Sequence, residues 1–243
     1  MKAMVLAAGL GTRLRPLTND RPKALVEICG KTLLEITLAR LREFGIREVI
    51  VNAHHFADIL IEYLKAHDNF GMAIEVSREE VLLDTGGGLK NAASFFRGSD
   101  EPFVLHNVDV LSTIDMNRMI EIHREHGALS TLAVQHRKTS RYLLFDNDLR
   151  LCGRRIGGDE EVVRTAPQVE ALAFCGIHVL SPRIFGLMKE EGAFSIIDAY
   201  LRLAAKGENI RGFRADEYYW RDLGKPENIA QAERDIRQNI VPG

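Results

Sequence analysis

The stretch LAAGLGTRLRP, residues 6–16, directly follows the first apolar run of the chain. Gly9 and Gly11 allow a positive φ and let the backbone approach a bound group closely. Arg13 and Arg15 add fixed positive charge to the same turn. Backbone N–H groups beside fixed cations are typical of anion sites, so the stretch predicts a phosphate held at the end of the first strand.

Apolar runs alternate with segments of helical spacing through the first part of the chain. Buried strands are expected at 3–8, 48–53, 72–76, 102–107 and 130–134, and helices at about 32–45, 55–66, 87–96 and 115–127. Thr32 and Glu35 form a capping box at the start of the first of these helices. This alternation predicts an α/β fold with a mostly parallel central sheet flanked by helices.

After residue 135 the alternation becomes looser. The runs at 142–146 and 149–153 predict a hairpin, 172–180 a buried strand, and 153–171 a polar loop or flap. Ser181, Ser195 and Pro226 stand where three further helices are expected to begin. Because the sequence contains no repeat and no evident linker, we expect one domain over residues 1–243.

The overall composition excludes several classes of protein. The chain has 243 residues and a formal net charge of −2, which gives no reason to expect a nucleic acid or a membrane as partner. Cys29, Cys152 and Cys175 are few and far apart, so a disulfide framework is not expected. The apolar run at the N-terminus is too short for a signal peptide. We therefore expect a cytoplasmic protein.

Two familiar phosphate-binding motifs do not fit the opening loop. A dinucleotide-binding G-x-G-x-x-G would need a third glycine where Leu14 stands, and Pro16 and Pro22 oppose a helix there. No Gly-Lys-Ser/Thr follows, so a P-loop is also excluded. What remains is a long loop that carries four cations, namely Arg13, Arg15, Arg21 and Lys23.

Residues 6–35, LAAGLGTRLRPLTNDRPKALVEICGKTLLE, resemble the signature of the sugar-1-phosphate nucleotidylyltransferases, also called NDP-sugar pyrophosphorylases. LLDTGGGLKNA at 82–92, NVD at 107–109 and WRDLG at 220–224 extend this resemblance over most of the chain. The short chain and its TGGG segment look most like compact bacterial members, such as the N-acetylmuramate-1-phosphate uridylyltransferases. The resemblance implies a Rossmann-like nucleotide-diphospho-sugar transferase fold.

The resemblance also implies a reaction, a cofactor and a set of site residues. A nucleoside triphosphate and a sugar 1-phosphate would give an NDP-sugar and pyrophosphate, for use in cell-wall or surface polysaccharide synthesis, with Mg²⁺ held by Asp109 and Asp222. Arg13, Lys23 and Asp109 would be catalytic. The implied nucleotide contacts are Leu6, Ala8, Gly9, Leu10, Gly11, Thr12, Arg13, Lys23, Thr85, Gly87 and Asn107, and the implied sugar-phosphate contacts are Gly176, Glu170 and Asp198.

This reaction places modest demands on the protein. The nucleophile is already an anionic phosphate oxygen, so no general base is required. Charge neutralisation and in-line positioning at the α-phosphorus carry the catalysis. We expect residues 1–135 to bind the nucleotide and residues 136–243 to bind the sugar. The family's E-K-P segment has no clear counterpart, and the flap could supply the missing contacts through Arg154, Arg155 or Glu170.

Several alternatives stay open at this point. Uridylyl transfer is the first expectation, and guanylyl transfer to a mannose- or heptose-type 1-phosphate is the second, because 83–90 also fits an L-x-T-x-G-x-L-K pattern. A protein of another class, a catalytically silent nucleotide-binding regulatory module, is disfavoured because the implied catalytic residues are all present. The apolar residues Ile229, Ala232 and Ile236 of the last helix could pack on the domain or on a second copy in a homodimer.

Overall fold

The computed structural model describes residues 1–241, which are arranged around a sheet of ten strands. Eight strands follow the order β11-β10-β9-β12-β6-β1-β4-β5, with β8 beside β12 and β13 beside β8. The sheet strands are β1 (Lys2–Leu6), β4 (Glu48–Ala53), β5 (Ala73–Arg78), β6 (Phe103–Asn107), β8 (Ser130–Gln135), β9 (Arg141–Phe145), β10 (Leu151–Ile156), β11 (Asp159–Val162), β12 (Glu170–Leu180) and β13 (Ile210–Arg214). Two short pairs lie outside it, β2 (Glu27–Ile28) with β3 (Lys31–Thr32), and β7 (Val110–Ser112) with β14 (Trp220–Asp222).

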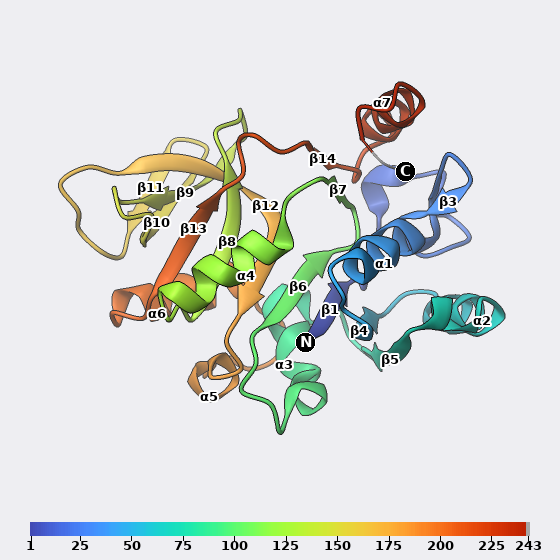
Figure 1. The fold of residues 1–243 in the computed structure, drawn as a ribbon, viewed down its shortest axis with the longest axis horizontal. Coiled ribbons are helices and arrows are strands. Elements are labelled where there is room, and N and C mark those ends of the chain that lie inside the picture. Colours follow the sequence, from blue (N-terminus) through green and yellow to red (C-terminus); the bar gives the residue numbers. More distant parts are fainter. Residues whose placement is uncertain (242–243) are drawn as a thin grey trace.

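The first four sheet strands of the chain are parallel and lie on the right of Figure 1. Strand β1 lies between β4 and β6, with Val5 opposite Val51 on one side and His106 on the other. Because all four strands point the same way, the segments that follow them meet at one edge of the sheet. This part of the sequence prediction is confirmed, since each expected strand is present within one or two residues.

The other side of the sheet corrects the expectation of a mostly parallel arrangement. Strand β12 runs antiparallel to β6, β8 and β9, and β10 runs antiparallel to β9 and β11, so the sheet as a whole is mixed. Only β13 and β8 form a parallel pair there. Short turns join β9 to β10 and β10 to β11, and such turns can join only antiparallel strands.

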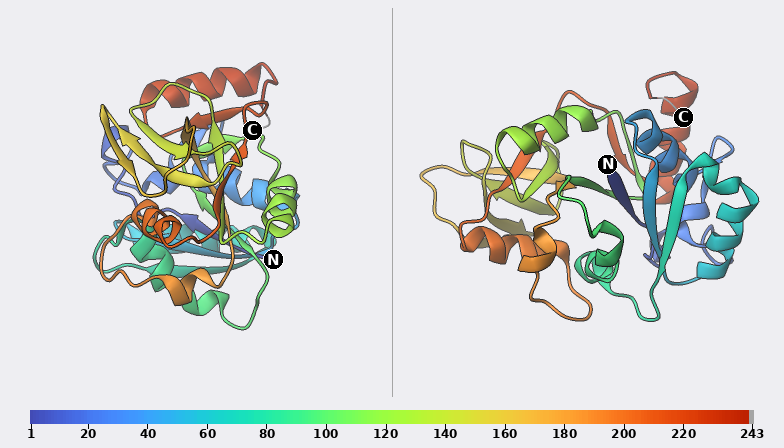
Figure 2. Two further views of the ribbon diagram at one scale, coloured as in Figure 1. Left: turned by 90° about the vertical axis from the view of Figure 1, so that its left-hand side faces the viewer. Right: turned by 60° about the horizontal axis from the view of Figure 1, so that its bottom comes forward.

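Helices cover both faces of the sheet. Ala3, Val5 and Val49 belong to one buried cluster with α1, α2, α4 and α7, whereas Met4 and Ile50 belong to the other with α3, α5 and α6. Figure 2 shows α3, α5 and α6 together on one side. The helices are α1 (Leu33–Glu43), α2 (Ala57–Ala66), α3 (Asp84–Asn91), α4 (Met116–Glu125), α5 (Ile184–Leu187), α6 (Ile196–Ala205) and α7 (Pro226–Arg237), with 3-10 turns η1 (Thr12–Leu14), η2 (Lys23–Leu25), η3 (Asp68–Gly71) and η4 (Ala93–Phe96).

The predicted hairpin is confirmed, but the predicted flap is partly wrong. Strands β9 and β10 pair around the turn at 146–148, where the Asp146 carboxylate accepts the N–H groups of Asp148 and Arg150. Within 153–171, β10 continues to Ile156 and pairs with β11, so most of this segment extends the sheet. The sequence concealed this because all four residues of β11 are exposed and show no apolar alternation.

The last helix packs on its own chain. Ile229 and Ala232 are buried in the core cluster, and Ile236 packs against it. The capping predictions hold for α1 and α6, where the hydroxyls of Thr32 and Ser195 accept a backbone N–H. Within residues 1–241, every helix is too short or too polar to cross a membrane.

Candidate active site

The loop after β1 leaves several backbone donors free. Gly11 has a φ of 64°, and its carbonyl accepts the Thr18 hydroxyl at 2.9 Å, which holds the loop in shape. A Cβ at Gly11 would lie 3.0 Å from the Thr18 methyl and 3.1 Å from the Lys23 Cβ, so the close turn requires glycine. Within the described chain, no group accepts the N–H of Gly9, Leu10 or Gly11. Such free donors are what an anion requires.

A buried network that the sequence analysis missed fixes the start of this loop. The side-chain oxygen of Asn52 accepts the N–H groups of Ala7 and Ala8 at 2.6 and 3.3 Å. The Asn52 amide donates to Glu79 at 2.7 Å, and the second Glu79 oxygen accepts the N–H of Leu83 at 3.0 Å. Asn52 and Glu79 are each 3% exposed. The signal that could have revealed Asn52 is a polar residue at the end of an otherwise apolar strand.

Pairing of β7 with β14 brings together two carboxylates that lie far apart in the sequence. Asp222 is opposite Val110 in this pair, and the Leu223 N–H donates to the Asp109 carbonyl at 2.8 Å. The Asp109 carboxylate forms an ion pair with the Lys23 ammonium at 2.9 Å, and both side chains are largely buried. The Asp222 carboxylate accepts the N–H of Gly224 at 2.7 Å. The structure therefore brings Lys23, Asp109 and Asp222 close together.

Arg13 lies on the same side of this site. A Cβ at Gly224 would be 2.6 Å from an Arg13 guanidinium nitrogen and 2.8 Å from an Asp222 oxygen. Only a residue without a side chain leaves room for the guanidinium here. The loop after β1 and the loop after β14 thus meet around two carboxylates and two cations.

Two adjoining cavities open on either side of Asp109. The first, the loop cavity, has a volume of about 410 Å³, and its polar lining residues include Lys23, Asn52, Glu79, Asp84, Thr85, Asn107 and Asp109. Leu6, Ala8 and Gly9 line it as well. The second, the cation-rich cleft, has a volume of about 600 Å³, and its charged lining residues are Arg13, Asp109, Arg137, Lys138, Arg221, Asp222 and Lys225. Asn107 and Asp109 line both cavities, so they mark the boundary between them.

An irregular segment of β12 forms one wall of the cation-rich cleft. The pairing of β12 with β8 shifts register between Phe174 and His178. Within this bulge Gly176 has a φ of 74°, and a Cβ there would lie 2.8 Å from the Asn107 amide nitrogen. Glycine is therefore required for both conformation and space. Burial raises the pKa of the neighbouring Cys175 to about 12, so this thiol is not a nucleophile at neutral pH.

Two groups on this wall were not identified from the sequence as site residues. The Arg137 guanidinium lies over the Trp220 ring at 3.8 Å and donates to the Phe174 carbonyl at 2.7 Å. The Trp220 indole N–H donates to the Cys175 carbonyl at 2.7 Å. The available signal was the W-x-D segment together with cations placed directly after β8, since Arg137 and Lys138 follow the strand end.

Comparison with known protein families identifies the family of this chain. The model of the family described as nucleotidyl transferase covers residues 2–239. The chain belongs to this family. The resemblance to sugar-1-phosphate nucleotidylyltransferases that the sequence indicated is thereby confirmed.

Relatives of several specificities resemble this nucleotidyl transferase. N-acetylmuramate alpha-1-phosphate uridylyltransferase of Caulobacter vibrioides is 36% identical over 97% of both chains. UTP–glucose-1-phosphate uridylyltransferase of Synechocystis is 29% identical over the whole chain and 66% of its own length. HddC of Yersinia pseudotuberculosis in complex with GMP-PN has the same fold, with a TM-score of 0.76, 23% identity and coverage of 97% and 99% of the two chains.

Some residues that the sequence assigned to the site of this nucleotidyl transferase lie elsewhere. Glu170 pairs with Arg214 at 2.6 Å, and Asp198 pairs with Arg154 at 2.5 Å, so neither sugar-phosphate candidate lines the cleft. Arg155 pairs with Glu160, so the flap arginines are also engaged outside the cleft. Leu10, Gly11 and Thr12 lie in the loop but line neither cavity.

The glycine-rich segment of this nucleotidyl transferase is helical rather than a loop. Gly86, Gly87 and Gly88 lie in α3 and are buried. A Cβ at Gly86 would be 2.3 Å from the Phe194 ring, and one at Gly87 would be 2.4 Å from the Gly192 carbonyl oxygen. Close packing therefore explains these glycines, whereas Thr85 does line the loop cavity as expected.

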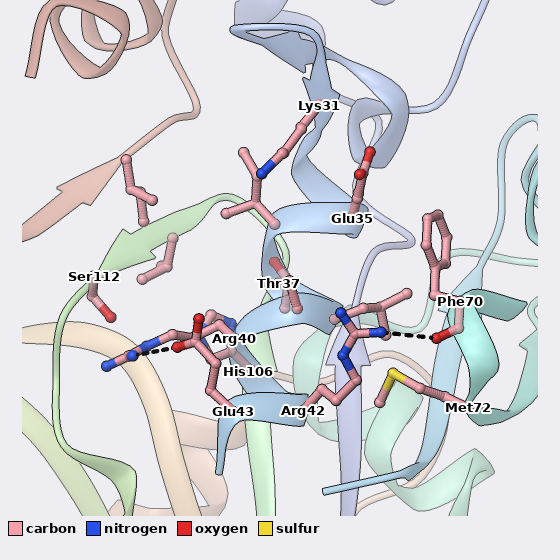
Figure 3. A pocket seen from close by; sticks show the side chains of 15 residues that line it. Lys31, Glu35, Thr37, Arg40, Arg42, Glu43, Phe70, Met72, His106 and Ser112 are labelled. Carbon is pink, nitrogen blue, oxygen red and sulfur yellow. Dashed lines mark hydrogen bonds and ion pairs between the residues drawn. The ribbon is translucent and has the colours of Figure 1, made fainter. Parts of the chain in front are cut away.

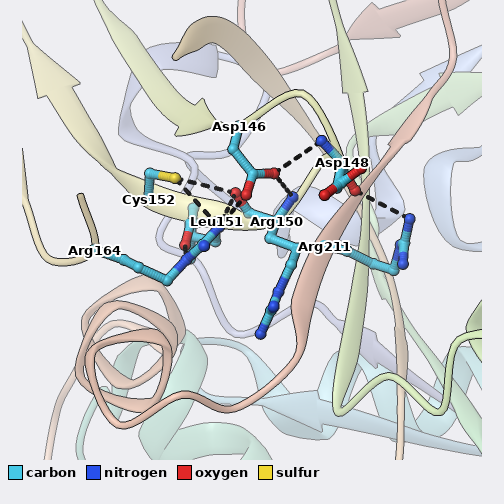
Figure 4. Close-up of polar contacts among 7 residues, drawn as sticks. All are labelled: Asp146, Asp148, Arg150, Leu151, Cys152, Arg164 and Arg211. Atoms are coloured by element: carbon cyan, nitrogen blue, oxygen red, sulfur yellow. Dashed lines mark hydrogen bonds and ion pairs between the residues drawn. The ribbon is translucent and has the colours of Figure 1, made fainter. Parts of the chain in front are cut away.

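Two further polar clusters do not converge on a ligand. A cavity of about 160 Å³ lies along α1, where Arg40 pairs with Glu43 and Arg42 donates to the Phe70 carbonyl (Figure 3). At the turn between β9 and β10, Arg164 pairs with Asp146 at 2.6 Å (Figure 4). Arg40, Arg42 and Arg164 thus bond to carboxylates or backbone carbonyls of the same chain, which gives these three side chains a structural role.

Proposed function

We propose that this nucleotidyl transferase transfers a uridylyl group from UTP to a sugar 1-phosphate of the N-acetylmuramate type and releases pyrophosphate. The relative at 36% identity over nearly the full length of both chains supports the choice of base and sugar. Residues 1–135 would bind the nucleotide, and residues 136–243 the sugar. This division is supported by the cavities, because most residues that line the loop cavity belong to the first part and most that line the cation-rich cleft belong to the second.

The observation that carries the proposal is that the pairing of β7 with β14 brings the segments of Asp109 and Asp222 together beside the boundary between the two cavities. The reaction joins two phosphates, and both substrates must present them at one point. Each carboxylate keeps one oxygen without a partner in the described chain, since Lys23 and the Gly224 N–H occupy only one oxygen of each. A cation held by the two free oxygens would lie where phosphates arrive from both sides and would neutralise their charge.

These two carboxylates fit a magnesium ion. Mg²⁺ prefers oxygen ligands and is commonly held by one or two carboxylates together with substrate phosphates. The described residues offer no cluster of three or more His, Cys, Asp or Glu side chains, which accords with a metal completed by substrate. When bound, the ion would polarise the α-phosphate and neutralise charge that develops there.

The other residues of the site would act on binding and charge. The free N–H groups of Gly9, Leu10 and Gly11 would hold the triphosphate. Arg13 would bind the β- and γ-phosphates and stabilise the departing pyrophosphate. Lys23, released from part of its ion pair with Asp109, would neutralise the α-phosphate. No group needs to remove a proton, because the attacking oxygen of the sugar phosphate is already ionised.

The proposal is tested by measuring pyrophosphate release with Mg²⁺ across four nucleoside triphosphates and several sugar 1-phosphates. We expect turnover with UTP and N-acetylmuramate 1-phosphate, and its loss when the metal is chelated. Turnover with GTP alone would replace uridylyl by guanylyl transfer. That second candidate is favoured by similarity to mannose-1-phosphate guanyltransferases, such as that of Candida glabrata, at 28% identity.

A protein of the regulatory class would give a different result. It would bind a triphosphate, measured by calorimetry, without releasing pyrophosphate in any combination. Absence of both binding and turnover would reject the proposal altogether.

A further inference from the structure

Arg137 differs from the other cations of the cleft in how it is held. Its guanidinium lies over the Trp220 ring, with 3.8 Å between the guanidinium carbon and the ring centroid. One of its nitrogens donates to the Phe174 carbonyl at 2.7 Å. A guanidinium both stacked and hydrogen-bonded has little freedom left, so its remaining donors are fixed in direction.

Trp220 is itself fixed from behind. Its indole N–H donates to the Cys175 carbonyl at 2.7 Å. Cys175 follows Phe174, whose carbonyl accepts the hydrogen bond from Arg137. Both carbonyls belong to the bulge in β12, where the pairing with β8 is interrupted. Arg137 and Trp220 therefore satisfy the backbone of this bulge and place Gly176 against Asn107 at the boundary of the two cavities.

The other cations of the cleft are engaged or exposed. Arg221 pairs with the buried carboxylate of Asp235 at 3.0 Å, and Lys225 lies 3.8 Å from Glu227. Lys138 is exposed. Arg137, in contrast, has no carboxylate within ion-pair distance anywhere in residues 1–241. Its Nε atom is buried from solvent and has no hydrogen-bond partner there. A partly buried cation without a counter-ion is costly unless a ligand supplies the opposite charge.

We propose that Arg137 binds the phosphate group of the sugar 1-phosphate, and that Trp220 positions the guanidinium for it. This inference rests on the proposed function and assigns a residue for which the sequence resemblance offered no counterpart. The planar fork of an arginine can donate two parallel hydrogen bonds to a phosphate, which a lysine ammonium cannot do in a stacked position. Trp220 is a positioning residue because it acts through Arg137 and the bulge.

A kinetic experiment tests the assignment in the full-length protein. Arg137→Lys keeps the charge but removes the stacked fork, and we expect the KM for the sugar 1-phosphate to rise about ten- to a hundredfold. The KM for the triphosphate should change less than about twofold, since Arg137 lines only the cation-rich cleft. Trp220→Phe, which keeps a ring but loses the bond to Cys175, should move the same KM in the same direction by less. Arg183→Lys, an exposed arginine paired with Glu208, is the matched control and should leave both values unchanged.

The chain supplies its own spectroscopic probe, because Trp220 is its single tryptophan. A ligand that binds the Arg137 guanidinium changes the environment of the indole ring beneath it. Titration of the protein with N-acetylmuramate 1-phosphate or glucose 1-phosphate, with and without a non-hydrolysable UTP analogue, is therefore expected to shift the Trp220 emission. The Arg137→Lys variant should require about ten times more ligand or more for the same shift.

The outcomes separate this inference from the proposed function. Turnover in the wild type with unchanged KM values in Arg137→Lys would overturn the inference and leave the function intact. Silence in pyrophosphate release, with a Trp220 response that Arg137→Lys weakens, would overturn the function and support the inference. Absence of any Trp220 response in the wild type would overturn the inference. Circular dichroism and urea unfolding of each variant verify that it is folded.

Discussion

The two sides of the sheet build their share of the site in different ways. On the parallel side, the end of β1 and the segment after it contribute Leu6, Ala8 and Gly9 to the loop cavity, and the Gly9 N–H has no acceptor in residues 1–241. On the antiparallel side, residues within 137–139, 174–176 and 220–228 form most of the lining of the cation-rich cleft, and Arg13, Asn107, Asp109 and Val110 complete it. The first arrangement leaves a compact motif in the sequence, whereas the second leaves isolated residues.

This difference has a physical origin. Backbone donors impose conformational requirements on consecutive residues, so glycines appear at fixed spacing. A side-chain site imposes requirements only on the ends of elements that the fold brings together. A single Asp or Arg at the end of a strand or helix does not by itself indicate a site, because the sequence does not show which other elements lie beside it.

The largest expected effect is the loss of stability in acid, which originates in and beside the antiparallel side. Burial lowers the pKa of His106 and His123 to about 4 and that of His178 to about 3. As pH falls below the unfolded value near 6.5, the unfolded chain takes up these protons and the folded chain does not. Stability is therefore fully present above that value and is lost toward pH 4, by about 2 kcal/mol for each histidine at pH 5.

Urea unfolding at pH 7 and pH 5 measures this loss. His123→Asn, which cannot be protonated but can still bond to Thr131, should reduce the difference by about a third. Equal stability at the two pH values would show that the histidines are protonated or exposed in the folded protein.

Asp109→Asn tests the point at which the two sides meet. The amide keeps the size of the side chain but removes the charge, so we expect kcat to fall about a thousandfold, equivalent to about 4 kcal/mol, with the fold retained. Pyrophosphate release measures kcat, and circular dichroism verifies that the fold is retained. Asp58→Asn, an exposed carboxylate paired with Arg78, is the matched control. Activity within about tenfold of the wild type would remove Asp109 from the reaction centre.

Asn52→Ala tests the support of the parallel side. The change leaves the N–H groups of Ala7 and Ala8 and the Glu79 carboxylate without their partner in a buried region. We expect the free energy of unfolding to fall by about 3 kcal/mol and the KM for the triphosphate to rise. Asn91→Ala removes an exposed amide bonded to Ser77 and should be nearly neutral. A stable variant with normal KM would mean that the loop keeps its shape without this network.

Gly87→Ala is expected to have the smallest effect, and it decides between packing and nucleotide contact. The added methyl group would lie 2.4 Å from the Gly192 oxygen, so we expect a loss of about 2 kcal/mol. Gly186→Ala, in the short helix α5 with open space around it, is the matched control. If Gly87→Ala instead kept the stability and raised the KM for the triphosphate, the nucleotide contact inferred from the resemblance would stand.

The sequence was informative where its requirements are local. It located β1, β4, β5 and β6 and the caps of α1 and α6, and it singled out Lys23, Asp109 and Asp222, which the structure brings close together. It did not reveal that β12 reverses the direction of the sheet, because an apolar run is equally compatible with either direction. The sequence assigned Glu170 and Asp198 to the sugar-phosphate contacts, but in the structure each forms an ion pair with an arginine outside the cleft. These partners come from segments far away in the sequence. Arg137 was not identified from the sequence because its position in the cleft depends on contact with Trp220, which is also distant in the sequence.

The pairing of β7 with β14 has a consequence for how the protein comes into being. During translation Asp109 can approach Asp222 only after the chain has been synthesised through β14. A nascent chain that stops before β14 would lack one carboxylate of the pair and the wall that carries Trp220. Under the proposed function, products that terminate before β14 are therefore expected to be inert.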